Sequence, residues 1–296
     1  MTGKVIKYPI GIQTFDKIIE GNYLYIDKTG YVHDLASKYN YVFLSRPRRF
    51  GKSLLSSTFH SYFAGDERLF RGLKAGEMNN DWRRHPVFHF DMSTAKHMAE
   101  EQLVRNLGYK LTEYEREYGN DPEISRDDVN ARLERLIKEA VDKTGEKAVI
   151  IIDEYDAPLL DVMNDKERLA PMPEIMRNFY SPLKSLAQLS IFSELNNLQN
   201  ISMMPEYSAV CGISQHEIES QMRDCVEQFA NRLGLTKRQV LAKLKEYYDG
   251  YHFSHNSEEI YNPFSLLKAL NAGEFGSYWF DTGTPTYLLE RLSKNE

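Results

Sequence analysis

The stretch Tyr41-Val-Phe-Leu-Ser-Arg-Pro-Arg-Arg-Phe-Gly-Lys-Ser53 joins a short apolar run to a basic loop, and a helical pattern begins at Leu54. Its end matches the pattern Gly-x-x-x-x-Gly-Lys-[Ser/Thr]. In that pattern backbone N–H groups surround phosphates at a helix N-terminus, the lysine reaches the terminal phosphates, and the hydroxyl binds Mg²⁺. The stretch therefore predicts a strand, a phosphate-binding loop and a helix. A basic turn before a helix is the alternative that the stretch alone leaves open.

The loop departs from this pattern at its first position. Gly51, Lys52 and Ser53 are in place, but Arg46 stands where the first glycine belongs. Glycine is favoured where the backbone needs a positive φ or a close approach, so we expect a conformational cost at Arg46. Pro47 fixes one φ angle in the loop and supplies no N–H donor.

A second stretch, Lys147-Ala-Val-Ile-Ile-Ile-Asp-Glu154, is an apolar run that ends in two acids. A continuous apolar run is typical of a strand buried on both faces of a parallel sheet. The acids then fall at the edge where ligands bind in open α/β sheets. Together with the loop, this run predicts a nucleotide-binding site. A solvated strand end followed by a turn is the alternative.

The predicted roles follow the chemistry of nucleotide hydrolysis. We expect Lys52 and Glu154 to be catalytic, with Glu154 polarising the attacking water, and Ser53 and Asp153 to hold Mg²⁺. The sequence lacks an Asn-Lys-x-Asp motif after the acidic strand, so ATP is the expected nucleotide. The residues predicted to bind it are Arg46, Pro47, Arg48, Arg49, Phe50, Gly51, Lys52, Ser53 and Leu54.

Three further charged residues are weaker candidates. Asp91 stands at the end of a strand predicted at 86–91 and is either a neighbour of the metal or the acceptor of a turn at the strand end. Arg177 and Lys184 are candidate cations near the phosphates. Asp27 and Lys28 are interpreted as a surface ion pair.

Composition excludes several classes of protein. The chain has 296 residues, 42% of them hydrophobic and 27% charged, which indicates a globular protein of one large or two ordinary domains. A net charge of −6 favours no general attraction to nucleic acid, although Arg48 and Arg49 leave local binding open. Cys211 and Cys225 are too few for a disulfide framework. No apolar run approaches the roughly 20 residues of a membrane span, so we expect a cytoplasmic protein.

The order of patterns predicts two regions, residues 1–200 around the loop and residues 201–296, mostly helical and rich in aromatic residues. Residues 23–29 are expected to form a short strand or extended segment beside the nucleotide. Capping boxes at 214–217 and 236–239 predict two helix starts. The late aromatic residues are interpreted as core, with stacking on nucleic-acid bases as the alternative. Helices are predicted at 31–38, 54–63, 66–73, 97–118, 126–142, within 172–189, and at 214–233 and 236–248.

With both phosphate elements present, the chain resembles the bacterial AAA-ATPase-like family, whose members often carry a C-terminal nuclease-like domain of the PD-(D/E)XK type. The resemblance implies an α/β fold, a P-loop NTPase with a three-layer αβα core and a mainly parallel sheet, followed by a mostly helical C-terminal region. It also implies that Arg46 is a family feature. The resemblance is carried by residues 11–15, 25–29, 46–53, 86–91, 152–156, 190–193, 195–198, 248–253, 261–264 and 278–285.

Two departures from the family affect the predicted function. The family has a central strand ending in Thr-Gly, but only residues 185–189 separate Lys184 from Ser190. If that strand is missing, we expect either that a neighbouring segment such as 189–192 fills its place in the sheet or that the fold is strained. The last hundred residues also lack Asp followed by Glu-x-Lys, so no nuclease site is expected. The sequence thus predicts Mg²⁺-dependent ATP hydrolysis that drives or gates a protein partner or a nuclease module. The alternative is a nucleotide-responsive switch or scaffold with little turnover.

Overall fold

A computed structural model describes residues 5–94, 100–160, 162, 165–183, 189–191 and 199–278. Up to Leu160 the elements are α1 (Phe15–Glu20), α2 (Thr29–Lys38), β1 (Tyr41–Phe43), α3 (Lys52–Phe63), the 3₁₀ turn Glu67–Phe70, α4 (Lys74–Met78), β2 (Val87–Asp91), the 3₁₀ turn Met92–Thr94, α5 (Glu100–Tyr118), α6 (Val129–Thr144), β3 (Val149–Asp153) and α7 (Ala157–Leu160). After it come α8 (Lys166–Leu169), α9 (Met172–Tyr180), β4 (Leu189–Ile191), β5 (Gln199–Asn200), the 3₁₀ turn Pro205–Tyr207, β6 (Ile213–Ser214), α11 (Gln215–Gln221), α12 (Arg223–Leu233), α13 (Lys237–Tyr248), β7 (Ile260–Tyr261) and α14 (Pro263–Ala272).

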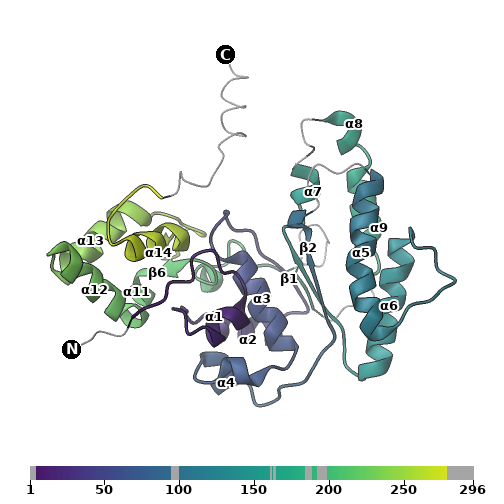
Figure 1. The fold of residues 1–296 in the computed structure, drawn as a ribbon, viewed down its shortest axis with the longest axis horizontal. Helices are drawn as coiled ribbons and strands as arrows, with labels where there is room; N and C mark the ends of the chain where they lie inside the picture. The colour runs from purple at the N-terminus through teal and green to yellow at the C-terminus, as the bar shows by residue number, and fades with distance from the viewer. Residues whose placement is uncertain are drawn as a thin grey trace.

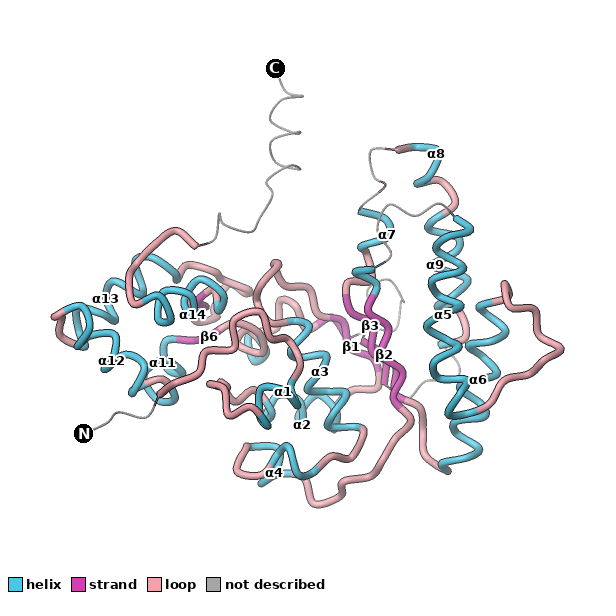
Figure 2. The backbone as a smooth tube through the Cα atoms, viewed as in Figure 1, coloured by secondary structure: helices cyan, strands magenta, loops and turns pink. Residues whose placement is uncertain are grey.

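The central feature is a five-stranded sheet in the order β2-β3-β4-β1-β5, with all neighbouring strands parallel. Figure 2 shows β1, β2 and β3 of this sheet in magenta. β4 lies between β1 and β3, so Leu189–Ile191 takes the central position in which the family has a strand ending in Thr-Gly. The expectation of a replacement by this neighbouring segment is therefore the one that the structure supports. The two predicted nucleotide-binding strands, β1 and β3, are separated by this one strand.

Alternate residues of β3 pack into two different apolar clusters. Ile151 belongs to a cluster with Val42 of β1 and Phe59 of α3, whereas Ile150 packs with Phe88 of β2 and Leu107 of α5. Successive strand residues point to opposite faces, so a strand covered on both faces has an uninterrupted apolar sequence. The mixed α/β class predicted from residues 147–154 is confirmed.

The C-terminal helices α11 to α14 lie together at one end of the molecule (Figure 1). In Figure 1, α11 to α14 lie on one side, α5, α6 and α9 on the other, and α1 to α3 with the sheet between them. Both predicted capping boxes are present: Ser214 Oγ accepts from the Glu217 N–H, and Thr236 Oγ1 from that of Gln239. The helix predicted for 214–233 is interrupted at Met222.

Several short helices, among them α14, were not predicted from the sequence. α14 begins at Pro263, and the Asn262 side chain caps it by accepting a hydrogen bond from the Ser265 N–H at 3.0 Å. Asn at the cap followed by Pro in the first turn is a recognised start signal. The helix was not predicted because the many aromatic residues around this signal were interpreted only as core. The strand considered for residues 23–29 is not formed, and α2 begins at Thr29 instead.

Apolar packing crosses the predicted domain boundary at residue 200, which stays a prediction. Tyr207, Cys211 and Phe253 belong to the same cluster as Phe50 and Phe59. In the other direction, side chains of residues 6, 8, 24 and 26 pack against the cluster of the C-terminal helices. Within the described residues, none of the helices has the length and apolar character of a membrane span.

Candidate phosphate-binding site

The phosphate-loop candidate and the acidic strand end line one cavity of about 160 Å³. The loop contributes Ser45, Arg46, Arg48 and Lys52, and its apolar wall comes from β1, α2 and α3. The end of β3 contributes its two acids and the two residues that follow. Because β1 and β3 are parallel, their C-terminal ends lie at the same edge of the sheet. The fold thus brings together two predicted stretches that lie a hundred residues apart.

The Lys52 ammonium points back into the loop. Its Nζ donates to the carbonyl oxygen of Arg46 at 2.9 Å and to that of Pro47 at 3.4 Å. The same Nζ lies 3.9 Å from Glu154 Oε1. Lys52 therefore connects the loop to the acidic strand end, and the charge that would meet a phosphate is held between them.

The strained backbone positions of the site differ from the one expected. Gly51, directly before α3, has a φ of +91°, which glycine adopts without cost. Arg49 has a φ of +69°, while Arg46, where we expected the cost, is not in the left-handed region. Glu154 is also left-handed, with a φ of +52°. Backbone strain therefore occurs on both sides of the cavity, a feature that concentrates at functional sites.

Arg46 is a buried structural anchor. It is 5% exposed, and its guanidinium donates to the carbonyl oxygens of Ser45, Ser202 and Tyr207 at 2.8 to 2.9 Å. Its Cζ also lies 4.1 Å from the centre of the Phe253 ring. Burial lowers the pKa of the guanidinium. These contacts explain why an arginine occupies the position of the first glycine, and they commit its side chain to protein groups.

Two further loop side chains reach the C-terminal part. Phe50 is 1% exposed, and its ring centre lies 4.7 Å from that of Tyr251 and 5.4 Å from that of Phe253. The Gly212 N–H donates to the Phe50 carbonyl oxygen at 2.9 Å. Arg49 lies over the Phe264 ring, with its Cζ 4.2 Å from the ring centre. Pro47, Arg48 and Arg49 are exposed, and Leu54 is partly buried.

The acidic end of β3 has the chemistry of a cation site. Asp153 is 7% exposed, and its Oδ1 accepts from the Glu154 N–H at 3.1 Å. No lysine, arginine or histidine among the described residues forms an ion pair with it. The described residues hold no group of three or more acidic, His or Cys side chains around one point. Mg²⁺ is commonly held by one or two protein oxygens together with substrate phosphates, so the Asp153 carboxylate fits it. Ser53, the other predicted ligand, is not among the residues that line the cavity.

The other candidates lie elsewhere. Asp91 is paired in register with Asp153, and its Oδ1 accepts from the Ser93 N–H at 2.8 Å, which is the turn contact considered for it. Arg177 is exposed on α9 and does not line the cavity, and Lys184 lies outside the described residues. Cys211 is buried, which raises the pKa of its thiol to about 11.

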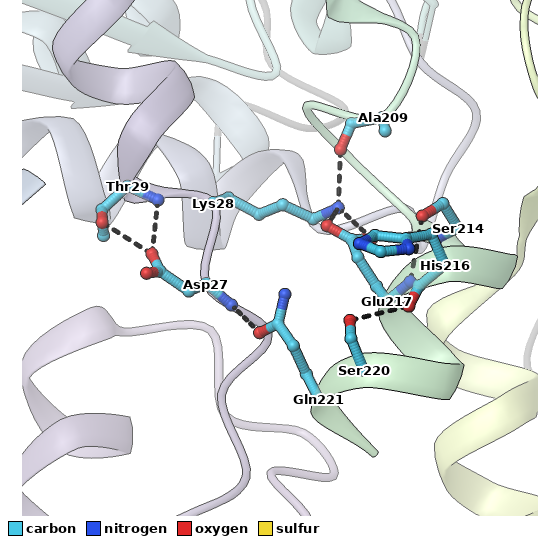
Figure 3. A network of polar contacts seen from close by, with 9 residues as sticks. All are labelled: Asp27, Lys28, Thr29, Ala209, Ser214, His216, Glu217, Ser220 and Gln221. Carbon is cyan, nitrogen blue, oxygen red and sulfur yellow. Dashed lines mark hydrogen bonds and ion pairs between the residues drawn. The ribbon is translucent and has the colours of Figure 1, made fainter. Parts of the chain in front are cut away.

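The interpretation of Asp27 and Lys28 as a surface pair was wrong. Lys28 Nζ bonds Glu217 Oε1 at 2.5 Å and the Ala209 carbonyl oxygen at 2.6 Å, and both side chains are about 90% buried (Figure 3). Burial lowers the pKa of Lys28, against the opposing effect of Glu217. Asp27 instead accepts from the Thr29 N–H at 2.8 Å. Glu217 is also the acid of a capping box. Its position in the sequence therefore predicted the helix cap but did not indicate the ion pair with Lys28.

Comparison with known proteins also indicates a nucleotide-binding family. The family model described as "Predicted AAA-ATPase" matches residues 9–204. An "Uncharacterized protein in vnfD 5'region" of Azotobacter chroococcum mcd 1 is 38% identical over 306 residues, covering 97% of this chain and 56% of that protein. The chain thus spans little more than half the length of this relative. No solved structure matches. On the loop, the acidic strand and this match, the chain belongs to the AAA-ATPase-like family.

Proposed function

We propose that the protein binds ATP with Mg²⁺ at the loop between β1 and α3 and hydrolyses it. The observation that carries this proposal is the single cavity lined by Lys52, Asp153 and Glu154. The family supports nucleotide binding, and hydrolysis is our extension of it. We keep the three-layer P-loop core as part of the same proposal, because the two apolar clusters use opposite faces of β3.

Lys52, Asp153 and Glu154 line the cavity, and we assign the other roles to the adjoining residues of the loop and of the start of α3. The Lys52 ammonium would exchange its two carbonyl partners for phosphate oxygens, which are stronger acceptors because they are charged. Ser53 and Asp153 would hold Mg²⁺, which when bound neutralises charge on the phosphates. Glu154, released from Lys52, would accept a proton from the attacking water. Backbone N–H groups of residues 50–53 would bind the phosphates at the start of α3.

Calorimetric titration with a non-hydrolysable ATP analogue and Mg²⁺ tests binding. We expect Lys52→Ala to weaken it about a hundredfold, because a charge-assisted contact is lost from the site. Exposed Lys17→Ala is the matched control and should bind like the wild type. Equal affinity of the wild type and Lys52→Ala would rule out this site.

Phosphate release tests turnover. Glu154→Gln keeps the size of the side chain but removes the base, so it should bind ATP and release phosphate at least about a hundredfold more slowly. If the wild type releases phosphate no faster than Glu154→Gln does, the proposal of hydrolysis is contradicted. The proposal of ATP binding is not affected by that outcome.

A second function is favoured by one specific observation. Arg46, Arg49 and Phe50 all pack on aromatic residues beyond position 250, so the loop is attached to the C-terminal part. We infer that a nucleotide which shifts the loop would shift these contacts, as in a nucleotide-responsive switch or scaffold. A protein partner or nuclease module gated by the nucleotide belongs to the same proposal. Contact with nucleic acid through Arg48 would predict a steep salt dependence of binding.

A further inference from the structure

Basic side chains of the phosphate loop and of the first residue of α3 are mostly committed to protein groups. Arg46 is buried and donates to carbonyl oxygens far along the chain. Arg49 lies over an aromatic ring of α14. The Lys52 ammonium bonds two carbonyl oxygens of the loop and lies 3.9 Å from Glu154. Arg48 is the remaining basic residue, and the contacts of the loop do not explain it.

Arg48 is exposed, and it lines the phosphate cavity together with Lys52, Asp153 and Glu154. Within the described part of the chain, its guanidinium has no hydrogen-bond, ion-pair or ring partner. A solvated surface charge is the ordinary explanation of an exposed arginine. The position of Arg48 in the wall of this cavity is the observation that indicates a further role.

The backbone on both sides of Arg48 is held in place. Pro47 before it has a restricted φ, and Arg49 after it has a φ of +69°. Two positions to either side, the buried side chains of Arg46 and Phe50 attach the loop to residues beyond 200. Strained backbone held by its surroundings is typical of functional sites. Only the side chain of Arg48 therefore has to become ordered when a phosphate binds.

The charges of the cavity leave a task for this guanidinium. The lining residues include three acids at or just beyond the end of β3, namely Asp153, Glu154 and Asp156. With Arg46 committed to carbonyl groups, Arg48 and Lys52 are the basic lining residues left to meet a phosphate chain. During phosphoryl transfer, negative charge spreads over the phosphate oxygens, and a guanidinium matches their geometry because its donors lie in one plane.

We propose that Arg48 is a catalytic residue that stabilises the transition state of ATP hydrolysis from within the same chain. Water forms a bond to the γ-phosphorus and gives its proton to Glu154. The bond from that phosphorus to the β–γ bridging oxygen breaks, and its electron pair stays on ADP. The Arg48 guanidinium donates hydrogen bonds to the oxygens on which charge develops and stays protonated throughout. This inference rests on the proposed function, because it assumes that ATP is hydrolysed at the loop.

Arg177, the other arginine considered for this role, provides a matched control. It is exposed on α9, whose apolar residues pack in the cluster that contains Ile150 and Phe88. In Figure 1, α9 and α3 lie on opposite sides of the sheet. Arg177 does not line the cavity. Arg177→Ala therefore removes an exposed arginine without changing a residue of the site.

Phosphate release at saturating ATP with Mg²⁺ tests the role of Arg48 in the whole chain. Arg48→Ala should lower kcat at least about a hundredfold, because the developing charge loses its donor, and Arg177→Ala should release phosphate like the wild type. A wild-type kcat for Arg48→Ala would overturn this inference alone. A wild type as slow as Glu154→Gln would overturn the proposed hydrolysis, and this inference with it.

Calorimetric titration with two ligands separates catalysis from simple binding and requires no turnover. A non-hydrolysable ATP analogue represents the ground state, and ADP with Mg²⁺ and aluminium fluoride mimics the phosphoryl group during transfer. Arg48→Ala should bind the first ligand within about threefold of the wild type, which also shows that the variant is folded, and the second at least about tenfold more weakly. Equal weakening for both ligands would make Arg48 a residue of uniform binding and overturn its catalytic role.

Discussion

The two sides of the candidate site are held by different kinds of contact. The acidic end of β3 is fixed by regular pairing with β2 and β4. The loop is fixed by side chains that reach far along the chain: Arg46 bonds Ser202 and Tyr207, which lie 156 and 161 positions away. One side thus depends on the sheet, and the other depends on residues beyond 200. A structural change in the C-terminal part should therefore displace the loop more than it displaces the acidic end of β3.

The largest effect should come from removing the aromatic anchor of the loop. Phe50→Ala leaves a cavity between Tyr251 and Phe253, so we expect the free energy of unfolding to fall by about 3 to 5 kcal/mol. Urea unfolding measures this loss, and the same variant should bind ATP more weakly. Ile150→Val on the β3 side should cost only about 1 kcal/mol and leave ATP binding unchanged. Weaker ATP binding by Ile150→Val than by Phe50→Ala would contradict the comparison.

Breaking the buried ion pair should come next. Lys28→Met removes the partner of Glu217 and leaves a buried carboxylate, which we expect to cost about 3 kcal/mol. Adding Glu217→Gln should recover part of that loss, since the unpaired charge is then gone. Chemical denaturation of both single variants and the double variant gives the coupling energy. Additive losses would show that the two side chains do not stabilise one another.

Arg46 offers a smaller test within the loop itself. Arg46→Met keeps much of the apolar contact with Phe253 but leaves three carbonyl groups without their donor, at a cost of about 2 kcal/mol. Exposed Arg48→Met is the matched control and should change stability by less than about 0.5 kcal/mol. Thermal unfolding in the absence of nucleotide distinguishes them. Equal melting temperatures would remove Arg46 from its role as anchor.

The smallest expected effect is a loss of stability at acidic pH, and it concerns the sheet side of the site. Burial lowers the pKa of both His60 and His89, whose ring centres are 6.1 Å apart, and for His89 the charge of His60 adds to this. The folded state then binds fewer protons than the unfolded chain, so stability is complete above pH 6.5 and falls as the pH drops below it. We expect a loss of about 1 kcal/mol near pH 5.5. His89→Gln should reduce this slope, and exposed His255→Gln should not.

Much of the fold and of the site could be predicted because the signals are local. The uninterrupted apolar run before Asp153 indicated a strand covered on both faces, and the capping box at Ser214 marked a helix start. The loop and the acids were predicted as a pair because parallel strands end at one edge of a sheet. β4 was not predictable from a local signal, since Leu189–Ile191 is short and its place between β1 and β3 depends on pairing with strands far along the chain.

The sequence by itself determined the parallel α/β class, the position of the loop between a strand and a helix, and the presence of two acids at the same edge of the sheet. Only the tertiary structure decided what the basic side chains do. Arg46 and Lys28 have the same charge as Lys52, but burial against distant carbonyl and carboxylate groups commits them to the protein. The physical reason is that the role of a charge depends on its partners and its access to water, which residues far along the chain supply.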